Sequence, residues 1–166
     1  VWRDDKRFVS TYFSKSNNEF LYSTFDYAKY DEDGYYFMLG RTDDVINVSG
    51  HRIGTREIEE VIQLYDNVVE TTVVGMFDNT KGQVPIAFIV PKENNLFSDN
   101  NKKIEEINNI KELINKQLGP FARPSKIYFV RLLPKTRSGK LLRRAIQAVL
   151  ENKDAGDLTT LEDPSS

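Results

Sequence analysis

The 166-residue sequence contains no cysteine and only one histidine, His51. The lack of cysteine excludes disulfide scaffolds, cysteine nucleophiles and zinc–thiolate sites, and a single histidine excludes paired-histidine metal sites. Beside Gly50 and Arg52, His51 is either a structural hydrogen-bonding residue or a functional one. Catalysis by this chain is therefore expected to use Lys, Arg, Asp, Glu, Ser, Thr or Tyr.

The sequence also has no long apolar run: none approaches the roughly 20 residues that a membrane-spanning helix needs. Residues 1–5 resemble neither a signal peptide nor an initiator sequence, so we expect the chain to begin inside a larger protein. Hydrophobic residues make up 39% and aromatic residues 11% of the sequence. This globular composition excludes a fibre or a disordered tail.

Net charge is small, at -2 from 23 Lys and Arg against 25 Asp and Glu, but the charges are unevenly placed. Residues 123–144, which we call the basic block, hold eight cations and no acid, where a random share would be about three. Residues 151–166 hold five acids and one lysine. The basic block is consistent with phosphate contact, nucleic-acid contact or a solvated face.

Short runs of β-branched or aromatic residues predict the strands. Asp33-Gly34 supplies the positive-φ residue that a tight turn requires and predicts a β-hairpin around residues 31–34. The expected strand segments are 21–29, 35–39, 45–48, 68–77, 85–90 and 127–133.

Apolar residues at helical spacing predict three helices. The first begins at Thr55, which we expect to cap it; the asparagine-rich stretch 94–109 runs into the second, which keeps helical spacing from Ile104 and ends before Gly119. The third covers 141–150 and is expected to leave Arg143, Arg144 and Gln147 facing outward. The element order predicts an α+β domain after about residue 45, preceded by the end of a strand-rich domain.

Two polar segments could carry chemistry. The loop 134–140 presents Lys140 beside a serine and a glycine, which allow close approach to a ligand, although it could equally be a mobile basic turn. It is not a Walker A loop, because that pattern requires glycine at Pro134 and Ser or Thr at Leu141. In the segment 40–54, Arg41 could clamp a phosphate or ribose, or form an ordinary salt-bridged turn.

Six motifs in order resemble the C-terminal part of the adenylate-forming enzymes, most closely the short-chain acyl-CoA synthetases for propionate and acetate. The resemblance runs from about Arg7 to the end. Phe25 replaces a glycine common in this family, and this departure, with the closing residues 158–165, resembles the propionyl branch. The motifs are Thr24-Phe25-Asp26, Asp33-Gly34-Tyr35, Gly40-Arg41-Thr42-Asp43-Asp44, Asn47-Val48-Ser49-Gly50-His51-Arg52, Glu57-Ile58-Glu59 and Pro134-Lys135-Thr136-Arg137-Ser138-Gly139-Lys140.

The resemblance implies three parts. Residues 1–42 would be the end of the N-terminal adenylation (AMP-binding) domain, contributing a β-hairpin fragment. Residues 43–150 would be a small C-terminal lid domain, with a short β-sheet flanked by helices, and residues 151–166 a C-terminal tail. The adenylation domain of the same chain is the expected partner, with no nucleic acid and no membrane. A cytoplasmic location is expected, and a mitochondrial one stays open.

The resemblance also implies a two-step ligase reaction at one site. A short carboxylate and ATP would form an acyl-adenylate and diphosphate, and the thiol of coenzyme A would then displace AMP. ATP with Mg2+ and coenzyme A would be substrates, with no tightly bound cofactor and no resident metal. Because the phosphate loop and acyl pocket of this family lie in its large domain, the fragment alone is expected to be inactive.

Four of the six motifs carry a role over from the family. The lysine loop would act in the first step, a glycine turn would face coenzyme A in the second, and a hinge would switch between them. Cations of the basic block, with Lys116, could meet the phosphates of coenzyme A. The implied site is Lys140 as catalytic residue, Asp26, Arg41 and Arg52 for ATP and AMP, Asp43 as hinge, and Ser49, Gly50 and His51 for coenzyme A.

Two other classes remain as alternatives. One is a stand-alone basic module that binds RNA or a protein partner through residues 123–144. The cations there are not interleaved with stacking aromatics of the RNP type, which argues against RNA. The other is the lid domain of a different adenylate-forming ligase, such as a luciferase-like or carrier-protein-directed enzyme.

Overall fold

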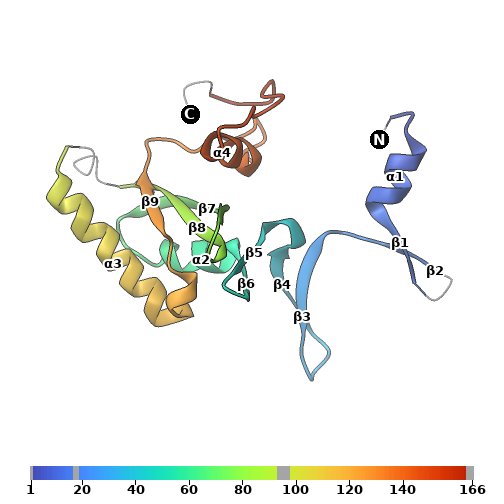
Figure 1. Cartoon of the computed structure of the whole chain (residues 1–166), viewed down its shortest axis with the longest axis horizontal. Coiled ribbons are helices and arrows are strands. Elements are labelled where there is room, and N and C mark those ends of the chain that lie inside the picture. Colours follow the sequence, from blue (N-terminus) through green and yellow to red (C-terminus); the bar gives the residue numbers. More distant parts are fainter. Residues whose placement is uncertain (1, 17–18, 93–97, 164–166) are drawn as a thin grey trace. The chain divides into compact units, whose positions relative to one another are not determined.

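The computed structural model describes residues 2–16, 19–92 and 98–163, and it divides the chain into two compact units, residues 1–43 and 44–166. Figure 1 shows their secondary structure. The predicted boundary between residues 42 and 43 remains a prediction about domains of a larger protein.

The first unit begins with a helix that the sequence pattern did not predict. In α1 (Asp5–Tyr12), the carboxylate of Asp4 accepts a 3.0 Å hydrogen bond from the amide of Arg7 and so caps the first turn. Strands β1 (Phe13–Ser16) and β2 (Glu19–Tyr22) then form an antiparallel pair. Leu21 belongs to this pair, so the predicted strand 21–29 is wrong for its first residues.

The predicted hairpin around residues 31–34 is confirmed. Strands β3 (Asp26–Tyr30) and β4 (Tyr36–Arg41) are antiparallel. In the turn, the Asp31 carboxylate accepts hydrogen bonds from the amides of Asp33 at 3.0 Å and Tyr35 at 2.8 Å. Gly34 has a φ of 90°, a conformation that glycine adopts without steric penalty.

The second unit is built on a five-stranded sheet. Its longest pairing is the antiparallel pair of β7, at one edge, and β8, and β8 also pairs with β5 and, in parallel, with β9. β6, which pairs with β5, was not predicted. The strands are β5 (Val45–Val48), β6 (His51–Gly54), β7 (Val68–Asp78), β8 (Gly82–Pro91) and β9 (Lys126–Phe129).

Helices cover both faces of this sheet (Figure 1). Neighbouring strand residues point to opposite faces, so Val73 packs with α2 (Thr55–Gln63) and α3 (Asn100–Leu118), whereas Val74 packs with α4 (Arg143–Leu150). The predicted α+β fold, a short sheet flanked by helices, is therefore confirmed for residues 44–163.

The predicted start of a helix at Thr55 is confirmed, whereas its predicted cap and the predicted end of one strand are wrong for local reasons. Gly54 rather than Thr55 is the N-cap of α2, and the Glu57 side chain accepts a 3.0 Å hydrogen bond from the Gly54 amide. The predicted strand 127–133 ends at Phe129, because the chain turns away and buries Leu133 in the apolar cluster under α4.

Gly75 in β7 provides a test of the core packing. A Cβ atom at this position would lie 2.5 Å from Cγ2 of Ile46, so Gly75→Ala must displace a buried side chain. We expect a loss of about 1–3 kcal/mol in the free energy of unfolding, measured by urea titration. Val69→Ala in the same strand is the control, since Val69 is 55% exposed and its truncation should cost less than about 0.5 kcal/mol. An equal or smaller loss for Gly75→Ala would contradict the packing.

Candidate functional site

Asp26 and Arg41 lie opposite each other where β3 begins and β4 ends. The Arg41 guanidinium is 4.0 Å from the Asp26 carboxylate, and the two side chains are 48% and 40% exposed. The structure thus brings together two residues that the sequence analysis assigned to one nucleotide. Their loose pairing and exposure leave the carboxylate able to accept further hydrogen bonds.

Phe25 stands where the family commonly has glycine, and the structure shows what its side chain contacts. Its φ of 60° is the left-handed conformation that a glycine would adopt without strain. The centroids of the Phe25 and Tyr12 rings are 5.8 Å apart. The central carbon of the Arg41 guanidinium lies 5.9 Å from the Phe25 centroid. The aromatic ring therefore offsets backbone strain with contacts that glycine cannot make, one of them to the arginine of the site.

The predicted hinge residue Asp43 lies in a short 3-10 helix, η1 (Thr42–Asp44), that follows β4. Its side chain lies outside the described part of the structure. The next residue, Asp44, is the first of the second unit, and its carboxylate is 3.4 Å from the guanidinium of Arg143.

Ser49 and Gly50 form the tight turn between β5 and β6. Both have positive φ, 52° and 88°, as a two-residue turn of the I′ type requires. The Ser49 amide donates a 2.8 Å hydrogen bond to the Lys81 carbonyl, which fixes the turn to the β7–β8 connection. A Cβ at Gly50 would meet nothing within 4 Å, so the turn has an open face.

His51 and Arg52, the next two residues, are both exposed and alternate across β6. The His51 ring stacks on Phe121, with centroids 4.7 Å apart and planes at 25°. Phe121 belongs to η3 (Pro120–Ala122) and packs against the core. His51 is therefore held by a residue that the sequence analysis missed, since no sequence spacing links residues 51 and 121.

Lys140 lies at the end of a closed loop rather than a loose turn. Thr136 donates its amide to the Lys140 carbonyl at 2.8 Å and accepts the Lys140 amide on its hydroxyl at 3.1 Å. The Gly139 amide also donates to the Thr136 carbonyl at 2.8 Å. Lys140 itself is exposed, and within the described residues its ammonium group has no hydrogen-bond or ion-pair partner. The loop therefore presents a free positive charge on an ordered backbone.

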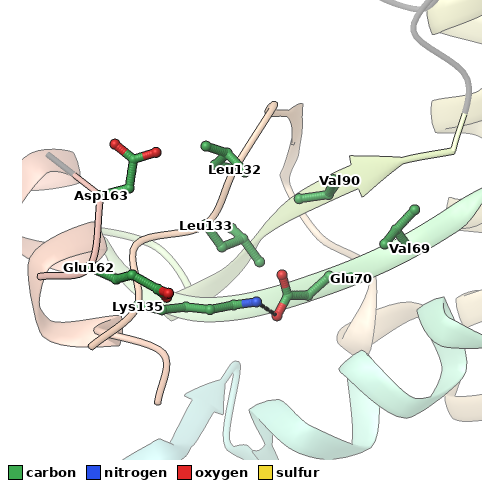
Figure 2. A pocket seen from close by; sticks show the side chains of 8 residues that line it. All are labelled: Val69, Glu70, Val90, Leu132, Leu133, Lys135, Glu162 and Asp163. Atoms are coloured by element: carbon green, nitrogen blue, oxygen red, sulfur yellow. Dashed lines mark ion pairs between the residues drawn. The ribbon is translucent and has the colours of Figure 1, made fainter. Parts of the chain in front are cut away.

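Several other cations of the basic block are engaged within the chain. The Lys135 ammonium is 2.8 Å from the Glu70 carboxylate, beside Glu162 in a groove of about 530 Å3 (Figure 2). Arg144 donates to the Asp157 carbonyl at 3.0 Å. Because partners within the chain already engage part of this positive charge, the basic block is less suited to binding a polyanion than its composition indicates.

Arg143 contradicts the predicted outward orientation. Its guanidinium donates to both oxygens of Glu59, at 2.7 and 2.6 Å, and their side chains are only 30% and 13% exposed. Glu59 also accepts the Val73 amide at 2.8 Å. One ion pair therefore joins α4, α2 and β7, and the spacing of residues in sequence gives no sign of it.

We expect Arg143→Met to destabilise the chain by about 2 kcal/mol, because it leaves the carboxylate of Glu59 without its cation. Urea unfolding of the 166-residue chain measures this. Arg56→Met is the matched control, since Arg56 and Glu60 pair at 2.9 Å with side chains 64% and 66% exposed, where a loss below about 0.5 kcal/mol is expected. Equal losses for the two variants would contradict a structural role for Arg143.

The described residues contain no group of three or more His, Cys, Asp or Glu side chains placed to hold a metal ion. They also include no helix long and apolar enough to cross a membrane.

Comparison with known sequences places these features in a family. Residues 57–140 match the family described as AMP-binding enzyme C-terminal domain. Propionate–CoA ligase from Salmonella typhimurium is 55% identical over 166 residues, which is 100% of this chain and 26% of that protein. Acetyl-coenzyme A synthetase from Pyrobaculum aerophilum is 45% identical over 166 residues, with 100% and 24% covered. The chain thus spans about a quarter of the length of these curated relatives.

Solved structures agree. ATP-bound MatB from Rhodopseudomonas palustris superposes with a TM-score of 0.71 at 26% identity, over 91% of this chain and 28% of that one. Anthranilate CoA ligase AuaEII, in complex with anthranoyl-AMP, gives a TM-score of 0.71 at 29% identity, over 89% and 27%. The alternative of a stand-alone basic module is not favoured. The chain belongs to the AMP-binding enzyme C-terminal domain family and matches the C-terminal portion of propionate–CoA and acetyl-CoA ligases.

Proposed function

We propose that this chain is the C-terminal part of an AMP-forming short-chain acyl-CoA synthetase. The enzyme would convert a short carboxylate, ATP and coenzyme A to acyl-CoA, AMP and diphosphate through an acyl-adenylate. The observation that carries the proposal is the ammonium group of Lys140, which meets no partner in the described part of the chain and stands on a hydrogen-bonded loop, in a chain 55% identical throughout to a propionate–CoA ligase. Propionate is the preferred acid in this proposal, and acetate the alternative.

In the first step, a carboxylate oxygen attacks the α-phosphorus of ATP, and the bond to the diphosphate oxygen breaks. Negative charge gathers between two anions, so a positioned cation lowers the barrier. Lys140 would supply that cation. Asp26 would accept hydrogen bonds from the ribose hydroxyls, and Arg41 and Arg52 would contact ribose or phosphate. Mg2+ would accompany ATP as part of the substrate.

In the second step, the thiol sulfur of coenzyme A attacks the acyl carbonyl, the thiol proton is lost, and AMP leaves. The turn at Ser49, Gly50 and His51 would lie along the pantetheine arm, where the missing side chain of Gly50 leaves room for the ligand. Rotation about Asp43 would exchange the Lys140 loop for this turn between the steps. Together, these assignments give the Lys140 loop and the Ser49–His51 turn separate half-reactions.

The product pattern tests the proposal. Full-length protein incubated with propionate, ATP and coenzyme A is expected to yield propionyl-CoA, AMP and diphosphate, detected by mass spectrometry and chromatography. Formation of ADP and phosphate, or no thioester with either propionate or acetate, would contradict it.

Phe121 gives a separate prediction for the second step. Removing its ring by Phe121→Ala frees His51 from its stacked position, and we expect thioester formation from supplied acyl-adenylate to fall about tenfold. Adenylate formation is expected to change less than about twofold, since Lys140 lies on another loop. His51→Ala should have the same effect, and the double variant no additional one. Additive losses would show that the stack does not act through His51.

A further inference from the structure

After α4, residues 155–162 fold back over the second unit. Ala155, Leu158 and Leu161 line an apolar groove of about 420 Å3 together with side chains of α4 and of the segment after β9. Leu158 is 37% exposed and Leu161 is half-buried. Burial of these leucines favours the folded-back path of the tail.

This segment also pairs with the base of the Lys140 loop through its backbone. Leu161 forms an antiparallel bridge with Thr136. The Arg137 amide donates to the Thr160 carbonyl at 3.1 Å, and the Glu162 amide donates to the Lys135 carbonyl at 2.8 Å. The Lys135 position pairs in turn with Leu141 across the loop. Residues 160–162 therefore act as a third strand beside the two stems of the loop.

Contacts at both ends hold this third strand. On one side, the Asp157 carbonyl accepts from Arg144 at 3.0 Å, and the Asp157 carboxylate accepts the Thr159 amide at 2.9 Å. The Thr159 hydrogen bonds, with Arg144 nearby, hold the pKa of Asp157 below its usual value. On the other side, Glu162 lies beside the Lys135–Glu70 ion pair (Figure 2). The segment is thus tied to α4 through Arg144 as well as to the loop, and its last residue lies beside β7.

We propose that residues 157–162 position Lys140 for catalysis by bracing its loop. Lys140 is exposed, and no described residue forms a hydrogen bond or ion pair with its ammonium group. The backbone of its loop therefore determines where its side chain begins. A loop that loses its outer strand samples more conformations, and a displacement of about 1 Å at a reacting centre can reduce a rate by about a hundredfold. The proposal rests on the function proposed above for Lys140, and it assigns residues 157–162 a positioning role in the first half-reaction only.

Two variants at one position separate the backbone from the side chain. Glu162→Pro removes the amide that donates to Lys135, whereas Glu162→Ala keeps this amide and removes only the carboxylate. In the full-length protein, Glu162→Pro is expected to slow acyl-adenylate formation about 10–100-fold, and to leave thioester formation from supplied acyl-adenylate within about twofold. Glu162→Ala should stay within about twofold in both steps. Unchanged adenylation in Glu162→Pro, or equal losses in both steps, would overturn the proposal.

A second pair of variants tests whether Leu161 holds the segment in the apolar groove. Leu161→Asp places a charge in the groove and should reproduce the selective loss, while Leu64→Asp, at a leucine that is 68% exposed, should not. Equal adenylation rates for these two variants would overturn the proposal.

Amide hydrogen exchange measures whether residues 157–162 hold the Lys140 loop, and it does not depend on the reaction. In Glu162→Pro, the amides of Arg137, Gly139 and Lys140 are expected to exchange faster than in the unaltered protein, and those of β7 should be unchanged. Unaltered exchange in the loop would overturn the brace. If the unaltered protein forms no acyl-adenylate with any short carboxylate, the proposed function fails, and the exchange measurement still decides whether the tail holds the loop.

Discussion

Replacing Lys140 by alanine is expected to reduce acyl-adenylate formation about 10²–10³-fold, because a single positioned charge donor contributes this much when charge develops in a transition state. Thioester formation from supplied acyl-adenylate should stay within about threefold, since the loop would have moved away for that step. The measurement is single-turnover kinetics of each half-reaction in the full-length protein. A selective loss would assign Lys140 to the first step.

Lys153→Ala is the control for this prediction. The Lys153 side chain is 71% exposed and its ammonium group pairs with Glu151 at 2.6 Å. Lys153 follows α4 in the sequence, whereas the Lys140 loop precedes it. Removing it should leave both half-reactions unchanged. If Lys140→Ala forms the adenylate at the unaltered rate, the assignment of Lys140 is wrong, whereas equal loss in both steps would indicate damage to the fold.

Gly50→Leu is expected to have the opposite pattern. A leucine would project into the space that the pantetheine arm is proposed to occupy, so thioester formation from supplied acyl-adenylate should fall about a hundredfold, with adenylation within about threefold. The chain itself leaves this space open, because a Cβ at Gly50 meets nothing within 4 Å. A clash of the added Cβ within this unit therefore does not account for a selective loss.

The backbone at Gly50 requires its own control, since its φ of 88° is unfavourable for any residue with a Cβ. Gly34→Leu imposes the same strain at a φ of 90° in the β3–β4 turn, outside the proposed site. Each substitution should reduce the free energy of unfolding by about 1–2 kcal/mol. Only Gly50→Leu should affect the second step, and a similar effect from Gly34→Leu would contradict a direct role for the glycine turn.

Local patterns predicted a large part of the fold. Runs rich in β-branched residues predicted β7 and β8, and the Asp33-Gly34 pair predicted the β3–β4 hairpin. The order of elements predicted an α+β domain. These features depend on residues a few positions apart, where side-chain spacing and turn geometry decide the structure.

Contacts between distant residues could not be predicted in this way. The pairing of Arg143 with Glu59 joins residues 84 apart, and it reversed the expected orientation of Arg143. The helical pattern there predicted the burial of Ala145 and Ile146 but could not show which outward residue meets the carboxylate of Glu59. The stacking of Phe121 on His51 and the pairing of residues 160–162 with the Lys140 loop likewise depend on how the chain returns in space.

The candidate site was predicted residue by residue from its motifs, and its geometry came only from the structure. Asp26 and Arg41 are separated by a hairpin whose register brings them opposite each other. The acidic tail, expected as a separate segment after residue 150, instead contacts the loop that carries Lys140. From composition alone, the charges of the basic block and the acidic tail offset each other in the net charge. The structure adds backbone hydrogen bonds that join the tail to the Lys140 loop.

Carboxylate-dependent exchange of labelled diphosphate into ATP tests the central claim most directly, because this exchange requires reversible acyl-adenylate formation and no coenzyme A. We predict exchange by the full-length protein with propionate, slower exchange with acetate, none without a carboxylate, and loss of the exchange in Lys140→Ala. No exchange with either acid, or exchange unaffected by Lys140→Ala, would contradict the account.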